Sequence, residues 1–345
     1  MSSNLKPLPM ARLLAIPGRT DRRIDRLMTV LAERPMLVIS GPRIAREIGV
    51  TRHAVWRWVE KLRSLGVAVK GHTGAGYRVE QAPDVLVPGL LNPRLRGTIF
   101  HHNLYHFFKA GSTSDIAIDL GHQGAPHGTV VIAEEQTAAR GRMRGRSWHS
   151  EKASGIYVSV LLRPSLAPAS AAMLTLVAGL ATREAVAQQT GLAPDIRWPN
   201  DLLLNGRKFT GILTEMHAVP DRIEFVVIGI GVNVNHEWFP EELEPLATSL
   251  RIETGRTHSR LEVLVRLLLE LERYYNRFMA DGAGPIVERF TKVSSYARGK
   301  RVRIEAATET FTGTTEGLEP NGLLRVRRDG GRVETVVSGS VREAS

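Results

Sequence analysis

The sequence contains no cysteine in its 345 residues. This absence excludes disulfide bonds, a thiolate nucleophile and any metal site ligated by cysteine. The hydrophobic fraction of 43% is ordinary for a globular protein and gives no indication of global disorder. A chain of this length is sufficient for two or three domains with a sizeable core.

Long apolar runs are also missing. No apolar stretch approaches the about 18 residues that a membrane span requires. Near the N-terminus the short apolar patch Leu13–Ile16 is flanked by prolines, and no basic segment leads into it. We therefore expect neither a signal peptide nor a membrane partner, and a cytoplasmic location is the default expectation.

The positive charge is unevenly distributed. Residues 1–82 hold 15 Lys/Arg and 6 Asp/Glu, a net charge of +9, whereas the other 263 residues hold 31 and 29. A basic N-terminal segment on a nearly neutral body indicates a polyanionic partner for that segment alone.

The basic segment has the pattern of a winged helix-turn-helix. Apolar spacing predicts helices over Arg22–Glu33, Pro42–Ile48 and Arg52–Leu65. Two short strands, Val67–Lys70 and Tyr77–Val79, flank a glycine-rich turn and predict the wing. The third helix is then the one expected to enter a major groove.

The candidate DNA contacts lie on or just before this third helix. One hydroxyl is placed to reach a phosphate, and the other side chains are placed to face the groove: Thr51, Arg52, His53, Trp56, Arg57 and Lys61. A winged helix used only for protein contacts is the alternative, and the basic charge favours DNA.

A change of pattern follows the winged helix. Three prolines in Ala82–Pro93 predict a linker, and a new series of elements starts with a strand expected near Thr98–His102. Gly155–Leu162 has the composition of a buried strand and Ala169–Gln189 that of an amphipathic helix. In Gly299–Arg342 the apolar residues alternate with a period of two, which predicts a small antiparallel barrel or sheet of about four or five strands.

The most unusual stretch is Glu134–Trp148, which reads EEQTAARGRMRGRSW and follows the apolar strand Thr129–Ala133. An Arg/Gly alternation has no helical or core-facing period, so we predict a loop. Glycine allows the backbone to approach a ligand closely, and arginine presents a planar fork that matches phosphate or carboxylate. The pattern fits a loop that closes over an anionic ligand, and a solvated basic loop or a nucleic-acid patch remains the alternative.

Two further signals lie in the central part. Asn205-Gly206 predicts a hairpin that carries Trp198-Pro199-Asn200-Asp201 on one side and Lys208 on the other. Asn233 interrupts the apolar strand GIGVNVN and must be satisfied by backbone or ligand. None of these three stretches supplies a serine–histidine or paired-carboxylate nucleophile arrangement, and the sequence has no Walker phosphate loop. Arginine, lysine and asparagine suit a reaction carried out by positioning, such as joining a carboxylate to the α-phosphate of ATP with Mg²⁺.

Together these motifs resemble the biotin protein ligases. The stretches EEQTAARGRMRGRSW, RWPNDLLLNGRKFTGILTE and GIGVNVN, followed by the C-terminal strands, occur in the family's order over about residues 20–342. The winged helix is similar to that of the bifunctional members that also repress the biotin operon. The resemblance implies an α+β multidomain fold. It would contain a winged helix-turn-helix (1–82), a linker (83–97), a mixed-sheet catalytic domain like the class II synthetases (98–295) and an SH3-like barrel (296–345).

The resemblance also implies substrates and partners. ATP with Mg²⁺ would activate biotin as biotinyl-5′-AMP, and a lysine of the biotin carboxyl carrier protein of acetyl-CoA carboxylase would then receive biotin. Operator DNA is expected as a second partner, and the protein is expected to form a homodimer when ligand binds. No dedicated set of protein ligands for a metal is expected, because Mg²⁺ would arrive with ATP.

Residue roles carried over from the family fall into three groups. Biotin binding would involve Ser112, Thr113, Ser114, Gln136, Arg140, Gly141, Arg142 and Lys208. Adenylate and nucleotide binding would involve Arg144, Gly145, Arg146, Trp148, Asn200 and Asn233. Lys208, Arg142 and Asp201 would act directly in catalysis.

Four positions depart from the family pattern QTAGRGRRGRSW and its neighbours. Ala139 replaces a glycine, which matters only if that position needs a positive φ. Met143 is an apparent insertion, Arg197 replaces a lysine, and Ser114 stands where asparagine is common. Three alternatives to a bifunctional ligase and repressor stay open. The first is a transcription regulator with an inactive ligase domain, and the second is a lipoate or octanoate ligase of the same fold. The third is a working ligase that no longer represses transcription.

Overall fold

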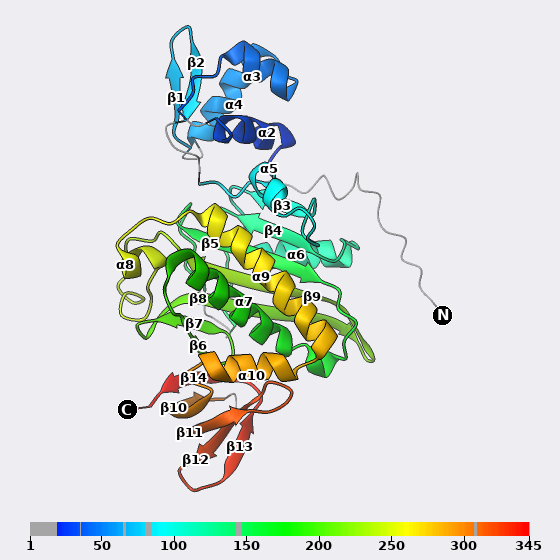
Figure 1. Ribbon diagram of the computed structural model, residues 1–345, viewed down its shortest axis with the longest axis vertical. Coiled ribbons are helices and arrows are strands. Elements are labelled where there is room, and N and C mark those ends of the chain that lie inside the picture. Colours follow the sequence, from blue (N-terminus) through cyan, green and yellow to red (C-terminus); the bar gives the residue numbers. More distant parts are fainter. Residues whose placement is uncertain are drawn as a thin grey trace.

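Three units follow one another along the length of the protein in the computed structural model, which describes residues 19–34, 36–64, 67–79, 84–142, 147–306 and 309–344. A winged helix lies at one end, a sheet covered by helices in the middle and a small antiparallel sheet at the other end (Figure 1). This arrangement confirms the predicted α+β fold class.

The N-terminal unit is the predicted winged helix. Its three helices are α2 (Arg22–Ala32), α3 (Gly41–Ile48) and α4 (Arg52–Ser64), and its wing is β1 (Val69–His72) paired antiparallel with β2 (Gly76–Val79). Helix α3 ends at Gly49, whose φ of 71° is the left-handed conformation that favours glycine.

The predicted linker contains ordered structure. Helix α5 (Pro88–Leu91) and the 3₁₀ turn η1 (Asn92–Arg94) occupy it, with proline in the first turn of each. Its apolar side chains are buried: Leu86, Val87, Leu90, Leu91 and Leu95. These leucines join the main hydrophobic core, so this segment packs on its neighbours, and the domain boundaries themselves stay a prediction.

The central unit is built on a seven-stranded mixed sheet with the order β3-β4-β5-β9-β8-β7-β6. Strands β3 and β4 are parallel, and the other neighbours are antiparallel. The strands are β3 (Leu104–Phe107), β4 (Thr129–Ala133), β5 (Gly155–Leu162), β6 (Asp195–Arg197), β7 (Asp201–Leu204), β8 (Arg207–Val219) and β9 (Arg222–Asn233).

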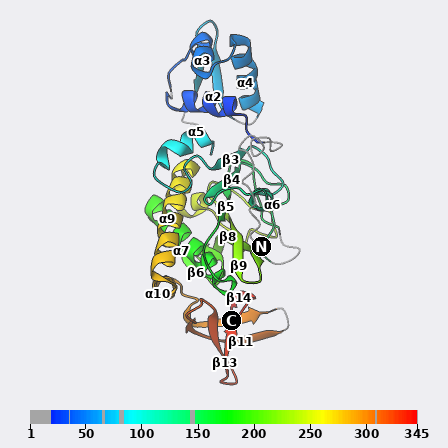
Figure 2. The same ribbon diagram turned by 90° about the vertical axis from the view of Figure 1, so that its right-hand side faces the viewer.

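Helices cover the two faces of this sheet unequally. On one face lie α7 (Met173–Thr190) and α9 (Arg260–Asp281), and on the other lies the shorter α6 (Thr113–His122) (Figure 2). The short helix α8 (Leu250–Thr254) follows β9, and α10 (Gly284–Val293) leads to the C-terminal unit. Because α6 is short, part of its face of the sheet stays uncovered.

Strand β9 shows why an open area exists on that face. Val226, Ile228 and Ile230 pack in the core with α7 and α9, whereas Phe225 and Val227 pack beneath α6. Since side chains alternate between faces, the next residues on the α6 face are Gly229 and Gly231. Two glycines there leave the backbone exposed to a ligand.

One helical segment among the described residues is long and apolar enough to cross a membrane, namely Pro168–Thr190, which includes the 3₁₀ turn η2 (Pro168–Ser170) and α7. Buried positions make up 67% of its most apolar window. We interpret its apolar composition as core packing between the sheet and α9.

The C-terminal unit is a five-stranded antiparallel sheet with the order β13-β12-β11-β10-β14. Its strands are β10 (Arg298–Glu305), β11 (Thr310–Leu318), β12 (Leu324–Arg328), β13 (Val333–Val336) and β14 (Ser340–Glu343). The strand predicted near Thr98–His102 is wrong, because these residues form a bend and turns, and His102 has a positive φ of 66°. The strand begins instead at Leu104.

Candidate functional site

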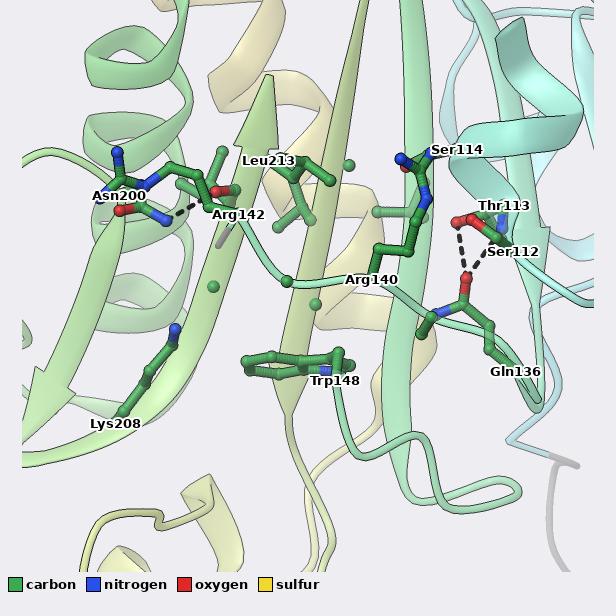
Figure 3. Close-up of a pocket in the computed structure, with 18 residues that line it drawn as sticks. Ser112, Thr113, Ser114, Gln136, Arg140, Arg142, Trp148, Asn200, Lys208 and Leu213 are labelled. Atoms are coloured by element: carbon green, nitrogen blue, oxygen red, sulfur yellow. Dashed lines mark hydrogen bonds between the residues drawn. The ribbon is translucent and has the colours of Figure 1, made fainter. Parts of the chain in front are cut away.

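A cavity opens on the α6 face of the central sheet (Figure 3). Glycines of β8 and β9 form part of its floor. The polar side chains around it come from α6, the arginine-rich segment and the β7–β8 hairpin: Ser112, Thr113, Ser114, Gln136, Arg140, Arg142, Asn200 and Lys208. The sequence predicted all eight as site residues.

The start of α6 forms one end of the cavity. Ser112 is its N-cap, and the Ser112 hydroxyl accepts from the backbone N–H of Asp115 at 3.3 Å. Gln136 Oε1 accepts from the backbone N–H of Thr113 at 2.8 Å and from its hydroxyl at 3.1 Å (Figure 3). Gln136 therefore fixes the helix terminus while its own amide nitrogen reaches Ser150 Oγ at 3.3 Å.

Behind this end lies a buried group of hydroxyls. Ser159 Oγ is 2.8 Å from Thr113 Oγ1 and 3.0 Å from Ser114 Oγ. A Cβ at Gly229 would lie 2.6 Å from Ser114 Oγ, so glycine is what permits α6 to approach the sheet so closely. These hydroxyls can donate or accept, which suits a small polar group that has both donors and acceptors.

Trp148 covers the middle of the cavity. A Cβ at Gly231 would lie 2.6 Å from its Cε2 and Nε1 atoms, and one at Gly211 would lie 2.8 Å from its Cζ3 atom. The indole thus packs against bare backbone on two neighbouring strands. Lys208 Nζ lies 5.4 Å from the indole centroid, within the range of a cation–π interaction.

Asp201 is held between two cations. Its carboxylate lies 2.5 Å from Lys208 Nζ and 2.8 Å from an Arg197 guanidinium nitrogen. Burial alone would raise the pKa of Asp201, but the charges of Lys208 and Arg197 outweigh burial and hold the pKa below its ordinary value. Asp201 is therefore an anion that positions Lys208 at neutral pH. Arg197, one of the four departures from the family pattern, supplies one of these two cations.

A second cavity adjoins the first, because Trp148 and Lys208 line both. Asn233 lines it, together with apolar side chains such as Phe239 and Leu246. The Asn233 amide donates to the backbone oxygen of Thr248 at 3.1 Å. Its buried Oδ1 has no hydrogen-bond partner among the described residues, which leaves an acceptor for a ligand.

Asn200 is oriented by the neighbouring strand. The side-chain Nδ2 of Asn200 donates to the backbone oxygen of Ile212 at 2.9 Å, and the backbone N–H of Ile212 donates to the backbone oxygen of Asn200 at 3.0 Å. Asn200 is buried and its side chain is already engaged. Its role is therefore to hold the hairpin that carries Asp201 and Lys208.

The arginine-rich segment crosses the cavity mouth. Arg140 pairs with Asp115 and, at 3.1 Å, with Glu215, and Figure 3 shows it pointing toward Ser114. Arg142 points toward Asn200 and donates to the backbone oxygen of Gly339 in the C-terminal unit. The predicted ligand contacts Arg144, Gly145 and Arg146, and the extra Met143, lie outside the described residues.

The departure at Ala139 has little structural cost. Among the described residues other than glycine, positive φ is found at Met36, His102, Ala153 and Asn205, so Ala139 does not need a glycine conformation. Ala139 is nearly buried, and its backbone oxygen accepts from the N–H of Trp148 at 3.1 Å. Alanine at this position is therefore compatible with the backbone hydrogen bond that joins residue 139 to Trp148.

The candidate DNA surface lies on α4. Val55, Val59 and Leu62 face the core, whereas all six predicted DNA contacts are exposed: Thr51, Arg52, His53, Trp56, Arg57 and Lys61. Trp56 is 52% exposed, unusual for so large an apolar side chain. Thr51 also caps the helix, because its hydroxyl accepts from the backbone N–H of Ala54 at 3.2 Å.

Two supports of the site were missed by the sequence analysis. Ser159 is a polar residue in the apolar strand GIYVSVLL, and that interruption was a usable signal. The second is Glu134, which is buried and pairs with Arg260 at 2.7 Å and with His106 at 3.1 Å. Since its partners are far away in sequence, no local pattern indicated this network.

The chain matches three families of known proteins. Residues 110–233 match the biotin/lipoate A/B protein ligase family, residues 23–78 an HTH domain, and residues 298–342 the biotin protein ligase C-terminal domain. Together these matches cover the three units of the fold.

Similar proteins of known function or structure span most of the chain. The bifunctional ligase/repressor BirA of Bacillus subtilis is 38% identical over 297 residues, which are 85% of this chain and 90% of that protein. The biotin--[acetyl-CoA-carboxylase] ligase of Mycobacterium tuberculosis is 36% identical, over 68% of this chain and 86% of that protein. The structure of an Aquifex aeolicus biotin protein ligase in complex with biotin and ATP is 29% identical with a TM-score of 0.61, covering 70% of this chain and 100% of that one.

Proposed function

The chain belongs to the biotin protein ligase family, and from this premise we propose how its residues bind biotin and ATP and carry out the reaction. It is an ATP-dependent biotin ligase with a DNA-binding domain, like the bifunctional ligase/repressors of this family. The observation that carries the assignment of roles is the position of Lys208, which borders both adjoining cavities.

In the proposed complex, biotin occupies the first cavity. Its ureido group, which has both N–H donors and a carbonyl acceptor, faces the hydroxyls of Ser112, Thr113 and Ser114 at the start of α6. Gln136 holds this helix terminus in place. The biotin carboxylate then points toward Lys208 and Arg142 at the opposite end.

ATP occupies the second cavity, with Asn233 beside the nucleotide and Trp148 between the two substrates. A biotin carboxylate oxygen attacks the α-phosphorus, pyrophosphate leaves, and biotinyl-5′-AMP forms. Lys208 lies where it can neutralise both the carboxylate and the α-phosphate, which lowers the electrostatic cost of bringing two anions together.

Mg²⁺ bound with ATP would supply further charge neutralisation at the phosphates. Asp201 is the carboxylate that lines the second cavity, among the residues that the structure describes. Mg²⁺ prefers carboxylate oxygens and water, so Asp201 is the residue that would hold it. No dedicated cage is needed for this role.

In the second step the ε-amine of a lysine on the biotin carboxyl carrier protein attacks the biotinyl carbonyl, and AMP leaves. This amine must first lose a proton, against a reference pKa of about 10.4. Because Lys208 and Arg197 lower the pKa of Asp201, Asp201 is a weak proton acceptor. We therefore assign Asp201 to positioning Lys208 rather than to general-base catalysis.

The test is Lys208→Ala assayed for pyrophosphate release with MgATP and biotin. We expect adenylate formation to be lost while the circular dichroism spectrum and the melting temperature change little. Lys152→Ala, at an exposed lysine, is the matched control and should keep full activity. Unchanged release by the Lys208 variant would remove this lysine from the mechanism.

The acid substrate is tested by replacing biotin with lipoate or octanoate. Turnover with biotin alone is the expected result. Release with lipoate or octanoate but not with biotin would reassign the acid, and no release with any acid would indicate an inactive ligase domain.

Operator binding is proposed for the exposed face of α4. Footprinting of the protein on the promoters of its own biotin-synthesis genes, with and without biotinyl-5′-AMP, tests this. We expect protection that strengthens with biotinyl-5′-AMP, because two half-sites of an operator are read by a two-fold dimer.

The homodimer is a separate proposal, tested by analytical ultracentrifugation. A monomer at saturating biotinyl-5′-AMP would rule it out. A cytoplasmic location also stays a prediction, tested by cell fractionation.

A further inference from the structure

Three side chains beside the second cavity form a cluster that the proposed ligase reaction does not use. They are His149, which directly follows Trp148, Glu151 two residues later, and His236, three residues beyond Asn233. One ligand atom from each lies within 4.8 Å of the other two. His236 is fully buried, and the other two side chains are partly buried.

Both imidazoles in this cluster hold a buried nitrogen without a partner. His149 Nε2 and His236 Nδ1 have no hydrogen-bond partner among the described residues. Burying a polar atom without a partner costs about 1–3 kcal/mol, so such atoms require an explanation. Two of them next to a carboxylate indicate a bound species that accepts lone pairs from nitrogen and oxygen.

The second ring nitrogen of His236 is engaged. The Tyr157 hydroxyl lies 3.3 Å from His236 Nε2 and donates to the backbone oxygen of Glu151 at 2.8 Å. A metal-binding histidine is usually oriented by a contact on its other nitrogen, which leaves the first free for the ion. Tyr157 provides this support and connects it to Glu151, the third member of the cluster.

We propose that His149, Glu151 and His236 bind a divalent transition-metal ion, for which Zn²⁺ is the best fit. Two imidazoles and one carboxylate are a set that Zn²⁺ accepts with nitrogen and oxygen bonds of about 2.0–2.2 Å, leaving a fourth position for water. Mg²⁺ and Ca²⁺ prefer sites made of oxygen alone. Donor atoms of a tetrahedral site lie about 3.3 Å apart, so small side-chain rotations complete the geometry.

The ion would join two segments that border the nucleotide cavity. The backbone N–H of Asn235 donates to the backbone oxygen of Ser154 at 2.7 Å. This hydrogen bond holds the end of β9 beside the segment that follows Trp148. A metal bridge from His149 to His236 would fix Trp148 and Asn233 relative to each other. The binding itself does not depend on the ligase assignment.

The competing explanation is that the two histidines only pack with aromatic residues. The His236 ring stacks on Phe239 with centroids 5.3 Å apart, and His149 lies 6.3 Å from the Trp238 ring. Packing of this kind accounts for the ring positions. It does not account for the carboxylate or for the two nitrogens without partners.

The experiment measures Zn²⁺ binding to the full-length protein by competition with a chelator of known affinity, without biotin or ATP. We expect one tightly bound Zn²⁺ per chain, and an affinity at least about 100-fold weaker in His149→Gln. His101→Gln is the matched control, because the His101 ring lies against His102, with centroids 3.7 Å apart, and belongs to a different histidine pair. The control should bind Zn²⁺ as the wild type does.

Either of two results would overturn the proposal: no tight Zn²⁺ in the wild type, or equal affinity in the wild type and His149→Gln. If His149→Gln fails to fold, Glu151→Gln takes its place, since it keeps both imidazoles and their packing. Co²⁺ gives an independent readout, with the strong visible absorption of four-coordinate Co²⁺ expected in the wild type and weak absorption in Glu151→Gln. Equal absorption in both proteins would contradict the assigned ligands.

Discussion

At the scale of single residues, the cavity depends on positions that carry no side chain. Gly211 and Gly231 let the indole of Trp148 rest on strand backbone, and Gly229 lets Ser114 approach β9. A side chain at any of these positions would occupy the space in which we place biotin or Trp148. The two glycines of GIGVNVN are therefore explained by the close approach of Ser114 and Trp148, and not by a requirement of the strand itself.

Gly231→Ala tests this view. The new Cβ would lie 2.6 Å from two atoms of the Trp148 ring, so the indole must shift. We expect kcat/KM for adenylate formation to fall roughly ten- to a hundred-fold, because a displacement of about 1 Å in a site costs this much. Pyrophosphate release is the measurement, with melting temperature recorded to show that the fold persists.

Gly179→Ala in α7 is the control for Gly231→Ala. Its Cβ would meet neighbouring atoms at 3.8 and 4.0 Å, which is ordinary contact. Alanine is favoured over glycine in a helix by about 1 kcal/mol, so stability should rise slightly and activity should not change. An equal loss of activity in both variants would contradict a specific role for Gly231.

Capping by Ser112 provides a second prediction. Ser112→Ala removes the hydroxyl that accepts from the backbone N–H of Asp115, and we expect a loss of about 1 kcal/mol in stability. The same change should weaken biotin binding. The control is Ser249→Ala, at the N-cap of α8, which should lower stability and leave biotin binding unchanged. Isothermal titration with biotin separates these two effects.

At the scale of elements, a buried ion network joins strand β4 to helix α9. Arg260 of α9 is buried and pairs with Glu134 at the end of β4 and with Asp84 at 2.9 Å. Glu134 Oε1 also accepts from the backbone N–H of Leu86 at 2.8 Å. This network fixes the point from which the segment carrying Gln136 departs.

Glu134→Gln should therefore be strongly destabilising. It leaves the buried Arg260 guanidinium without its closest counter-charge, for which the expected cost is about 3–5 kcal/mol. Urea denaturation at pH 7 measures this cost. Glu241→Gln, at an exposed carboxylate, is the control and should change stability by less than about 0.5 kcal/mol.

The same carboxylate predicts a pH dependence. Burial alone would raise its pKa, but Arg260 and His106 together lower the pKa of Glu134 from 4.5 to about 2. The unfolded chain then binds more protons than the folded one between these values, so stability falls as pH drops from about 4.5 toward 2. The full effect is roughly 3 kcal/mol, and Glu134→Gln should flatten this part of the stability profile.

At the scale of the whole molecule, polar contacts tie the three units together. The Trp198 indole N–H donates to the backbone oxygen of Gly322 at 2.9 Å, linking the WPND turn to the C-terminal sheet. At the other end the backbone N–H of Gly89 donates to Asp25 of the winged helix at 2.7 Å. These two hydrogen bonds join the central unit to both of its neighbours.

DNA binding provides a prediction at this scale. Arg57→Ala and Lys61→Ala remove exposed charges from α4, so each should weaken operator binding and reduce the slope of affinity against salt concentration by about 1. Binding titrations at several salt concentrations measure the slope. Lys292→Ala, on α10, is the control, and an unchanged slope in the α4 variants would place the DNA elsewhere.

The sequence by itself determined the order of the units and most of the elements, because apolar periodicity and turn residues are local signals. The winged helix, strand β5, the Asn205-Gly206 hairpin and the C-terminal strands were predicted close to their observed bounds. One prediction failed where local preference was ambiguous, because turns occupy the positions of the strand expected near Thr98–His102. The short helix α5 within the proline-containing segment was not predicted either.

The tertiary structure alone decided which residues meet. The sequence indicated Ser112, Gln136, Lys208 and Asn233 as site residues, but their convergence depends on strand order and on the uncovered face of the sheet. Pairings such as Arg260 with Glu134 join residues 126 positions apart. Such contacts leave no periodic trace in a chain, because burial and partner geometry arise only after the strands and helices have packed.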